Sequence, residues 1–165
     1  MSVPKTVVDA LNAQMGRELE AHLQYLSISS YFDAEGLPEL SKFFAAQAAE
    51  EHAHAMRFLD YIQDVGGPVV IPGLAAPKPT FESAEEAVSA SLEWEEAVTD
   101  NIHRLVDLAS ESHDHATNTF LQWFVTEQVE EVSTIGELLA VTRRAGERNL
   151  LLVEDYVARS AHTPE

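Results

Sequence analysis

Apolar side chains recur at alternating steps of three and four residues along most of this chain, which is the pattern of helices that bury one face. The pattern predicts helices at about residues 4–35, 38–65, 83–112 and 117–145, and a shorter helix at 149–160. Gly36, Gly66 and Gly146 follow the first, second and fourth segments, as is usual at helix C-termini. Ser83 and Glu86 form a capping box that begins the third helix. The sequence therefore predicts an all-α fold.

The connection at residues 66–82 is long and shows no helical period. Residues 68–82 contain four of the seven prolines, which favours an extended segment. An up-and-down bundle needs only short turns, so this connection indicates a crossover between two parallel helices. We expect residues 1–165 to form one four-helix bundle with a long crossover between helices 2 and 3 and a short fifth C-terminal helix. Because four long helices complete a bundle, the apolar fifth helix is expected to contact other subunits.

Glutamates interrupt the apolar faces of all four long helices, near the middle of each. An unpaired carboxylate inside a helical core costs on the order of several kcal/mol, so such a residue is either paired or binds a metal. One glutamate of this kind is readily explained as a surface residue, whereas four helices that share the feature at one level indicate a common site. The interrupting residues are Glu18, Glu51, Glu95, Glu127, Gln128 and Glu131.

His54 follows Glu51 by three residues, so the two side chains lie about 60° apart around a helix and can reach one point. A Glu-x-x-His pair that faces carboxylates from other helices is the arrangement of dimetal sites in helix bundles. The chain has no cysteine, which leaves His, Asp and Glu as ligands. Such ligands suit iron, manganese or zinc.

The formal net charge is −18, with only 10 Lys and Arg against 28 Asp and Glu. Nucleic acid binding is therefore not expected, whereas an acidic surface would attract cations. The N-terminus lacks the features of a signal peptide, and no stretch approaches the roughly 20 apolar residues of a membrane span. We expect a cytoplasmic protein with no membrane partner.

Four segments resemble those of the bacterial non-haem ferritins, in the same order and with similar spacing. They are RELEAHLQY at 17–25, AAEEHAHAM at 48–56, SLEWEEAV at 91–98 and FLQWFVTEQVEEV at 120–132. The resemblance covers essentially the whole chain, including the crossover and the fifth helix, and implies a single ferritin-like domain.

The resemblance also implies roles for individual residues. One iron would be bound by Glu18, Glu51 and His54, with Glu51 bridging to a second iron held by Glu95 and Glu131. Gln128 and Tyr25 match the hydrogen-bonding and redox-active positions of the family. A third iron site would be formed by Glu50, Glu127 and Glu130.

The function that follows from the resemblance is a ferroxidase, which oxidises Fe(II) with O2 or peroxide and deposits ferric mineral in a hollow shell of twenty-four subunits. Haem is not expected. In the haem-containing bacterioferritins a methionine follows the bridging glutamate, whereas this chain has His52, and a second Glu-x-x-His is replaced by EQVEE at residues 127–131.

Three other functions remain open from the sequence. A peroxidase or catalase of the same fold could use a diiron or dimanganese site without storing iron, and a haem-type bacterioferritin would share the bundle. A scaffold without redox chemistry is the third, if the core glutamates are protonated or paired with histidine.

Overall fold

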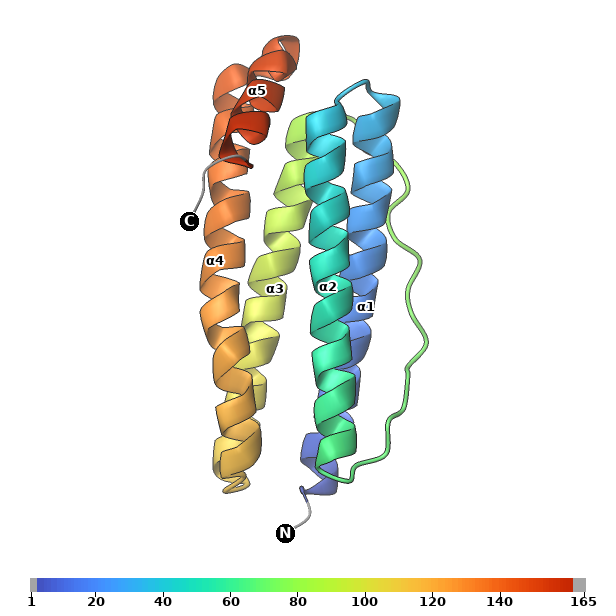
Figure 1. Cartoon of the computed structure of the whole chain (residues 1–165), viewed down its shortest axis with the longest axis vertical. Helices are drawn as coiled ribbons and strands as arrows, with labels where there is room; N and C mark the ends of the chain where they lie inside the picture. The colour runs from blue at the N-terminus through green and yellow to red at the C-terminus, as the bar shows by residue number, and fades with distance from the viewer. Residues whose placement is uncertain (1–2, 162–165) are drawn as a thin grey trace.

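The structure is a computed structural model, and it describes residues 3–161. Four long helices lie side by side, and a short fifth helix leans back against the end of the bundle (Figure 1). These elements confirm the predicted all-α fold class. Within the described residues no helix is both long enough and apolar enough to cross a membrane. The helices are α1 (Lys5–Ala34), α2 (Pro38–Asp64), α3 (Ala84–Glu111), α4 (His115–Ala145), the 3₁₀ turn η1 (Glu147–Asn149) and α5 (Leu150–Ser160).

The segment between α2 and α3 runs along the outside of the bundle beside α1, from one end to the other (Figure 1). As a result, α2 and α3 point in the same direction, as the crossover predicts. Asn12 of α1 anchors this segment, because its amide donates to the Pro68 carbonyl at 2.9 Å and accepts from the Val70 N–H at 2.7 Å. Gly16 lets the segment approach α1 closely: a Cβ atom at this position would lie 2.3 Å from Cγ of Pro72.

Two glutamates of the C-terminal segment cap other helices at the same end of the bundle. Glu154 of α5 accepts a hydrogen bond from the Leu40 N–H in the first turn of α2, at 2.9 Å. Glu147 of η1 accepts from the N–H groups of Ala84 and Glu85 in the first turn of α3, at 3.2 and 3.0 Å. First-turn N–H groups have no partner within their own helix and favour negative charge. These contacts therefore attach the C-terminal segment to the bundle.

The fifth helix differs in one respect from the expectation that it would find little to bury within its own chain. Val153 and Val157 are buried against the bundle, whereas Leu151 and Leu152 are 76% and 63% exposed. The expectation was wrong for the first pair, because α5 packs one face against α2 and α4 and Glu154 attaches it to the first turn of α2. Contact with other subunits remains a prediction for the two exposed leucines.

The start of α4 lies slightly earlier than the sequence pattern indicates. The side chain of Asp114 accepts hydrogen bonds from both the N–H and the hydroxyl of Thr117, and so caps the helix. The helix consequently begins at His115 rather than near residue 117. The polar residues after Asp114 therefore belong to the first turn of α4 and not to a loop, and one of them, Thr117, is buried.

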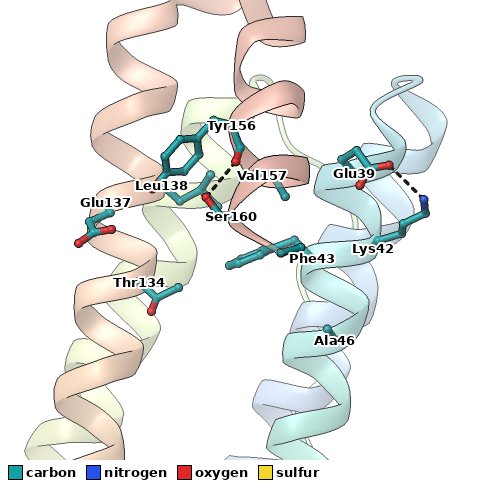
Figure 2. A pocket seen from close by; sticks show the side chains of 11 residues that line it. Glu39, Lys42, Phe43, Ala46, Thr134, Glu137, Leu138, Tyr156, Val157 and Ser160 are labelled. Atoms are coloured by element: carbon teal, nitrogen blue, oxygen red, sulfur yellow. Dashed lines mark hydrogen bonds and ion pairs between the residues drawn. The ribbon is translucent and has the colours of Figure 1, made fainter. Parts of the chain in front are cut away.

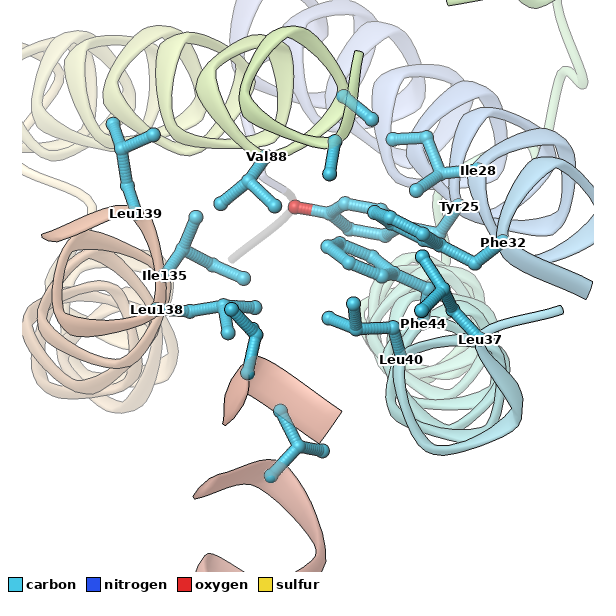
Figure 3. Close-up of a cluster of buried hydrophobic side chains, with 14 of the residues drawn as sticks. Tyr25, Ile28, Phe32, Leu37, Leu40, Phe44, Val88, Ile135, Leu138 and Leu139 are labelled. Carbon is cyan, nitrogen blue, oxygen red and sulfur yellow. The ribbon is translucent and has the colours of Figure 1, made fainter. Parts of the chain in front are cut away.

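The apolar core is divided into two clusters by a band of polar side chains. One cluster, near α5, includes Phe32 and Phe44, and Figure 3 shows its side chains converging from all the helices. The other cluster, toward the opposite end, includes Met15, Phe58 and Phe124. On every long helix the interrupting glutamates fall between the residues of these two clusters. The bundle therefore places them at one level, which we call the carboxylate layer: Glu18, Glu51, His54, Glu95, Gln128 and Glu131.

Candidate metal centre

All six side chains of the carboxylate layer are buried, and each long helix contributes at least one. Their burial follows from the helical repeat, since every one occupies a position on an otherwise apolar face. Buried carboxylates without cationic partners are costly, so the layer needs protons, hydrogen bonds or bound cations. The contacts within the carboxylate layer show which carboxylates have hydrogen-bond donors and which are placed to bind a cation.

Glu18, Glu51 and His54 form the tightest group. Each offers one ligand atom, and the three atoms lie within 4.8 Å of one another. The His54 Nδ1 atom is 3.3 Å from Glu51 Oε2 and 4.0 Å from Glu18 Oε2. Glu18 Oε1 accepts from the Gln14 amide at 2.9 Å, but Glu18 Oε2 has no hydrogen-bond partner. Two buried carboxyl groups beside an imidazole form the donor set of a metal site.

A second group consists of His54, Glu127 and Glu131, whose ligand atoms also lie within 4.8 Å of one another. The His54 Nε2 atom is 3.9 Å from Glu127 Oε1, so carboxylates face both ring nitrogens. A neutral imidazole has a lone pair on only one nitrogen and can bind a metal on one side at a time. The two groups therefore share His54. The Glu127 side chain is 24% exposed, which brings the second group to the surface of the bundle.

Glu95 is held from two sides. The buried Tyr25 hydroxyl donates to Glu95 Oε1, and the Gln128 amide donates to Glu95 Oε2 at 3.1 Å. Gln128 also donates to Thr99 Oγ1 at 3.2 Å. A carboxylate has about four acceptor positions, so these two bonds orient Glu95 and leave it able to bind a cation.

The electrostatics of the layer favour protons on the metal-free carboxylates. Burial raises the pKa of Glu18 and Glu51 well above the usual range, with the charge of Glu51 adding to the effect at Glu18 and that of Glu95 at Glu51. Burial, followed by the charge of Glu95, raises the pKa of Glu131 to about 9. For Glu95 itself burial raises the pKa, while the hydrogen bonds from Tyr25 and Gln128 oppose the shift. Cations that bind here would displace these protons.

The three glutamates predicted for a third iron site lie less close together. Glu127 is half-buried beside His54, and the exposed Glu50 lies close enough to Glu131 to raise its pKa. Glu130 is exposed and belongs to neither three-ligand group among the described residues. The structure therefore brings two of the three to the edge of the layer and leaves Glu130 in solvent.

Two contributors to the layer were not predicted as site residues. Gln14 orients Glu18 from one helical turn before it, a spacing that could have identified it. The Trp123 ring lies edge-on to the His54 ring, with centroids 5.4 Å apart, and the Arg57 guanidinium lies 3.7 Å above the Trp123 ring. Sequence patterns do not show this contact, because the neighbours of Trp123 on α2 depend on how the helices pack.

A large apolar groove lies elsewhere, between α2, α4 and α5 (Figure 2). Its volume is about 600 Å³, and its lining includes Phe43, Leu138 and Tyr156. None of the residues of the carboxylate layer lines this groove. The layer is packed tightly between the two apolar clusters, an arrangement suited to ions rather than to an organic substrate.

Comparisons with known proteins agree with this arrangement. The sequence profile of the family described as Ferritin-like domain matches residues 8–145. Ferritin BfrB of Mycobacterium tuberculosis is 41% identical over 157 residues, which cover 94% of this chain and 86% of the relative. The bacterial non-heme ferritin of Staphylococcus epidermidis is 37% identical over 156 residues, covering 93% of this chain and 94% of the relative.

Solved structures give the same result for the fold. The open pore ferritin from the hyperthermophilic archaeon Archaeoglobus fulgidus superimposes with a TM-score of 0.92 at 36% sequence identity. The alignment covers 94% of this chain and 96% of the archaeal one. The similarity therefore extends over the whole bundle, including the crossover and α5.

Proposed function

This chain belongs to the ferritin family, and we propose that it is a ferroxidase that oxidises Fe(II) at the carboxylate layer and stores the ferric product. The observation that carries the proposal is the convergence of three buried side chains, Glu18, Glu51 and His54, whose ligand atoms lie within 4.8 Å of one another. In the metal-free protein the adjacent carboxyl groups of Glu18 and Glu51 can share a proton, and a bound cation would replace it.

Two Fe(II) substrate ions are accommodated by the donors available. Glu18, Glu51 and His54 bind the first ion, and Glu51, Glu95 and Glu131 bind the second. The family resemblance is what assigns Glu51 as the bridging ligand, and Glu95, Glu131 and Glu51 do not form one of the two close ligand groups found among residues 3–161. The protons that burial retains on these carboxyls leave as the ions bind.

The redox step is the oxidation of two Fe(II) ions bound by anionic carboxylates. Two Fe(II) ions each give one electron to O2, which with two protons becomes hydrogen peroxide. With peroxide as the oxidant, the same two electrons and two protons give two water molecules. Anionic oxygen ligands favour Fe(III) over Fe(II), and so the carboxylates make the oxidation more favourable. Tyr25 and Gln128 orient Glu95 during this step. The family resemblance assigns a third, outer iron to Glu50, Glu127 and Glu130, and in this part of the proposal Glu130 has to turn inward from solvent to reach the other two.

Storage is the second part of the proposal. The family resemblance supports a hollow shell of twenty-four subunits, assembled in the cytoplasm, whose acidic wall attracts Fe(II) and nucleates mineral. The net charge of −18 suits that role. Haem is not part of the proposal, because the chain has His52 and the sequence EQVEE at the two positions where bacterioferritins carry haem and diiron ligands.

The test compares Glu51→Ala with Glu96→Ala, an exposed glutamate on α3 that serves as the control. Fe(II) is added in air to metal-free protein, and ferric absorbance is followed by stopped flow. We expect loss of the rapid phase in Glu51→Ala, no change in Glu96→Ala, and the same elution volume on a sizing column for both. Rapid oxidation by Glu51→Ala would refute the ferroxidase assignment.

Iron storage is tested separately, by adding tens of Fe(II) ions per chain to the wild-type protein and passing the product down the sizing column. Ferric iron that elutes with a particle of about twenty-four subunits is the expected result. Retention of only about two ions per chain on a small species would instead identify a diiron enzyme that does not store iron.

A further inference from the structure

Two histidines lie close together outside the carboxylate layer, on the helix pair α1 and α2. The ring centroids of His22 and His52 are 5.6 Å apart, and the ring planes meet at 60°. His22 is half-buried and His52 is exposed. The neighbouring carboxylates Glu18 and Glu51 are buried in the bundle, so the histidine pair presents a separate set of donors.

The tautomer of His22 is determined by a hydrogen bond to the backbone. Its Nδ1 atom lies 2.6 Å from the carbonyl oxygen of Ala48, which can only accept, so Nδ1 carries the hydrogen. The neutral ring then has its lone pair on Nε2. Metal-binding histidines are commonly oriented in this way, by one ring N–H that donates to a backbone carbonyl while the other nitrogen binds the ion. Ala48 lies one helical turn before His52, so this bond also fixes the ring relative to the turn that carries His52.

The spacing of the rings suits a shared ion. Two imidazoles bound to one tetrahedral ion, with metal–nitrogen distances of about 2.0–2.1 Å, place their ring centroids about 5 Å apart. The observed 5.6 Å is close to that value. His52 is exposed and can adjust its rotamer toward the His22 ring, which is held by its bond to the Ala48 carbonyl.

We propose that His22 and His52 together bind one divalent transition-metal ion of the borderline class, such as Cu²⁺ or Zn²⁺, at a site distinct from the carboxylate layer. The ion class follows from the donors, since a pair of imidazoles suits copper and zinc, whereas carboxylates suit harder cations. Water completes the coordination on the exposed side. This site does not depend on the ferroxidase function.

The experiment uses Cu²⁺ at no more than one ion per chain, added to the metal-free assembled protein. Electron paramagnetic resonance reports the nitrogen ligands through their superhyperfine couplings, and competition with a chelating dye gives the affinity. The variants are His22→Gln, which keeps an N–H donor for the Ala48 carbonyl, and His52→Gln. His103→Gln, at an exposed histidine on α3, is the matched control.

We expect two coupled nitrogens in the wild-type protein and in His103→Gln. His22→Gln and His52→Gln should each weaken copper binding at least about tenfold and lose one nitrogen coupling. Glu95→Ala, which disrupts the carboxylate layer on α3 and leaves both histidines in place, should leave the copper signal unchanged. If His22→Gln binds copper as tightly as the wild type, the ion is held by His52 alone. If Glu95→Ala loses the copper signal, the ion is bound in the carboxylate layer. Either result would overturn the proposal.

Discussion

Glu131→Gln is expected to stabilise the metal-free protein at alkaline pH and to have little effect at acidic pH. Glu131 is only 4% exposed, and burial together with the charge of Glu95 raises its pKa from 4.5 to about 9. Between these two values the unfolded chain has lost the proton that the folded protein retains. The folded state is therefore progressively disfavoured as the pH rises through this window, and glutamine, which cannot ionise, removes the effect.

The size of the effect follows from the two pKa values. Between pH 5 and pH 8, ionisation of Glu131 lowers the free energy of unfolding by about 4 kcal/mol. For a chain of this length each kcal/mol changes the melting temperature by roughly 2–4 °C, so Glu131→Gln should melt roughly 10 °C above the wild type at pH 8. At pH 5 the two proteins should melt within a few degrees of each other.

The assay is thermal unfolding by circular dichroism in the presence of a chelator, at both pH values and at one protein concentration. Glu130→Gln serves as the control, because Glu130 is the exposed neighbour on the same helix and should not change the pH dependence. Adding Zn²⁺ should make the wild type melt above Glu131→Gln at pH 8. The Glu131 carboxylate of the wild type can bind the ion, whereas the glutamine of the variant cannot, and binding to the folded state stabilises it. A melting difference between Glu131→Gln and wild type that is the same at pH 5 and pH 8 would refute the electrostatic reasoning.

Two further predictions concern the segments that surround the bundle. Gly16→Val should displace the crossover, because its Cβ would lie 2.3 Å from Pro72 Cγ. We expect the free energy of unfolding to fall by about 1–3 kcal/mol. Limited proteolysis should also cut faster within residues 68–82. An unchanged cleavage rate would contradict the close packing. Glu154→Ala removes the acceptor for the Leu40 N–H and should lower the free energy of unfolding by about 1 kcal/mol. Asp155→Ala, at the exposed adjacent position, is the comparison, and equal melting temperatures for the two variants would argue against the cap.

Much of the fold was predictable because helical periodicity is local. The apolar repeat located the helices, and the long proline-containing connection required a crossover. The same repeat placed Glu18, Glu51 and Glu95 on buried faces, and the three-residue spacing of Glu51 and His54 set their relation on a single helix. These features depend on residues within one or two turns of each other, which a sequence displays directly.

Contacts between helices were decided only by the tertiary structure. The sequence does not show that Tyr25 of α1 holds Glu95 of α3, or that His54 faces Glu127 as well as Glu18. Each contact depends on the axial shift and rotation of one helix against another, and these are determined by how the whole core packs. A shift of one residue would turn a side chain by about 100° and break such a contact.

The burial of α5 and the pairing of His22 with His52 also depend on contacts between helices and not on local sequence patterns. The apolar pattern of α5 was evident, but whether Val153 or Leu152 is buried depends on where Glu154 docks on α2. His22 and His52 are thirty positions apart and occupy different helices, so only the register of α1 against α2 makes them neighbours. The helices and the chemistry that each face carries therefore follow from local sequence patterns. The packing of those faces decided which groups meet, because that depends on the free energy of the entire core and not on any one segment.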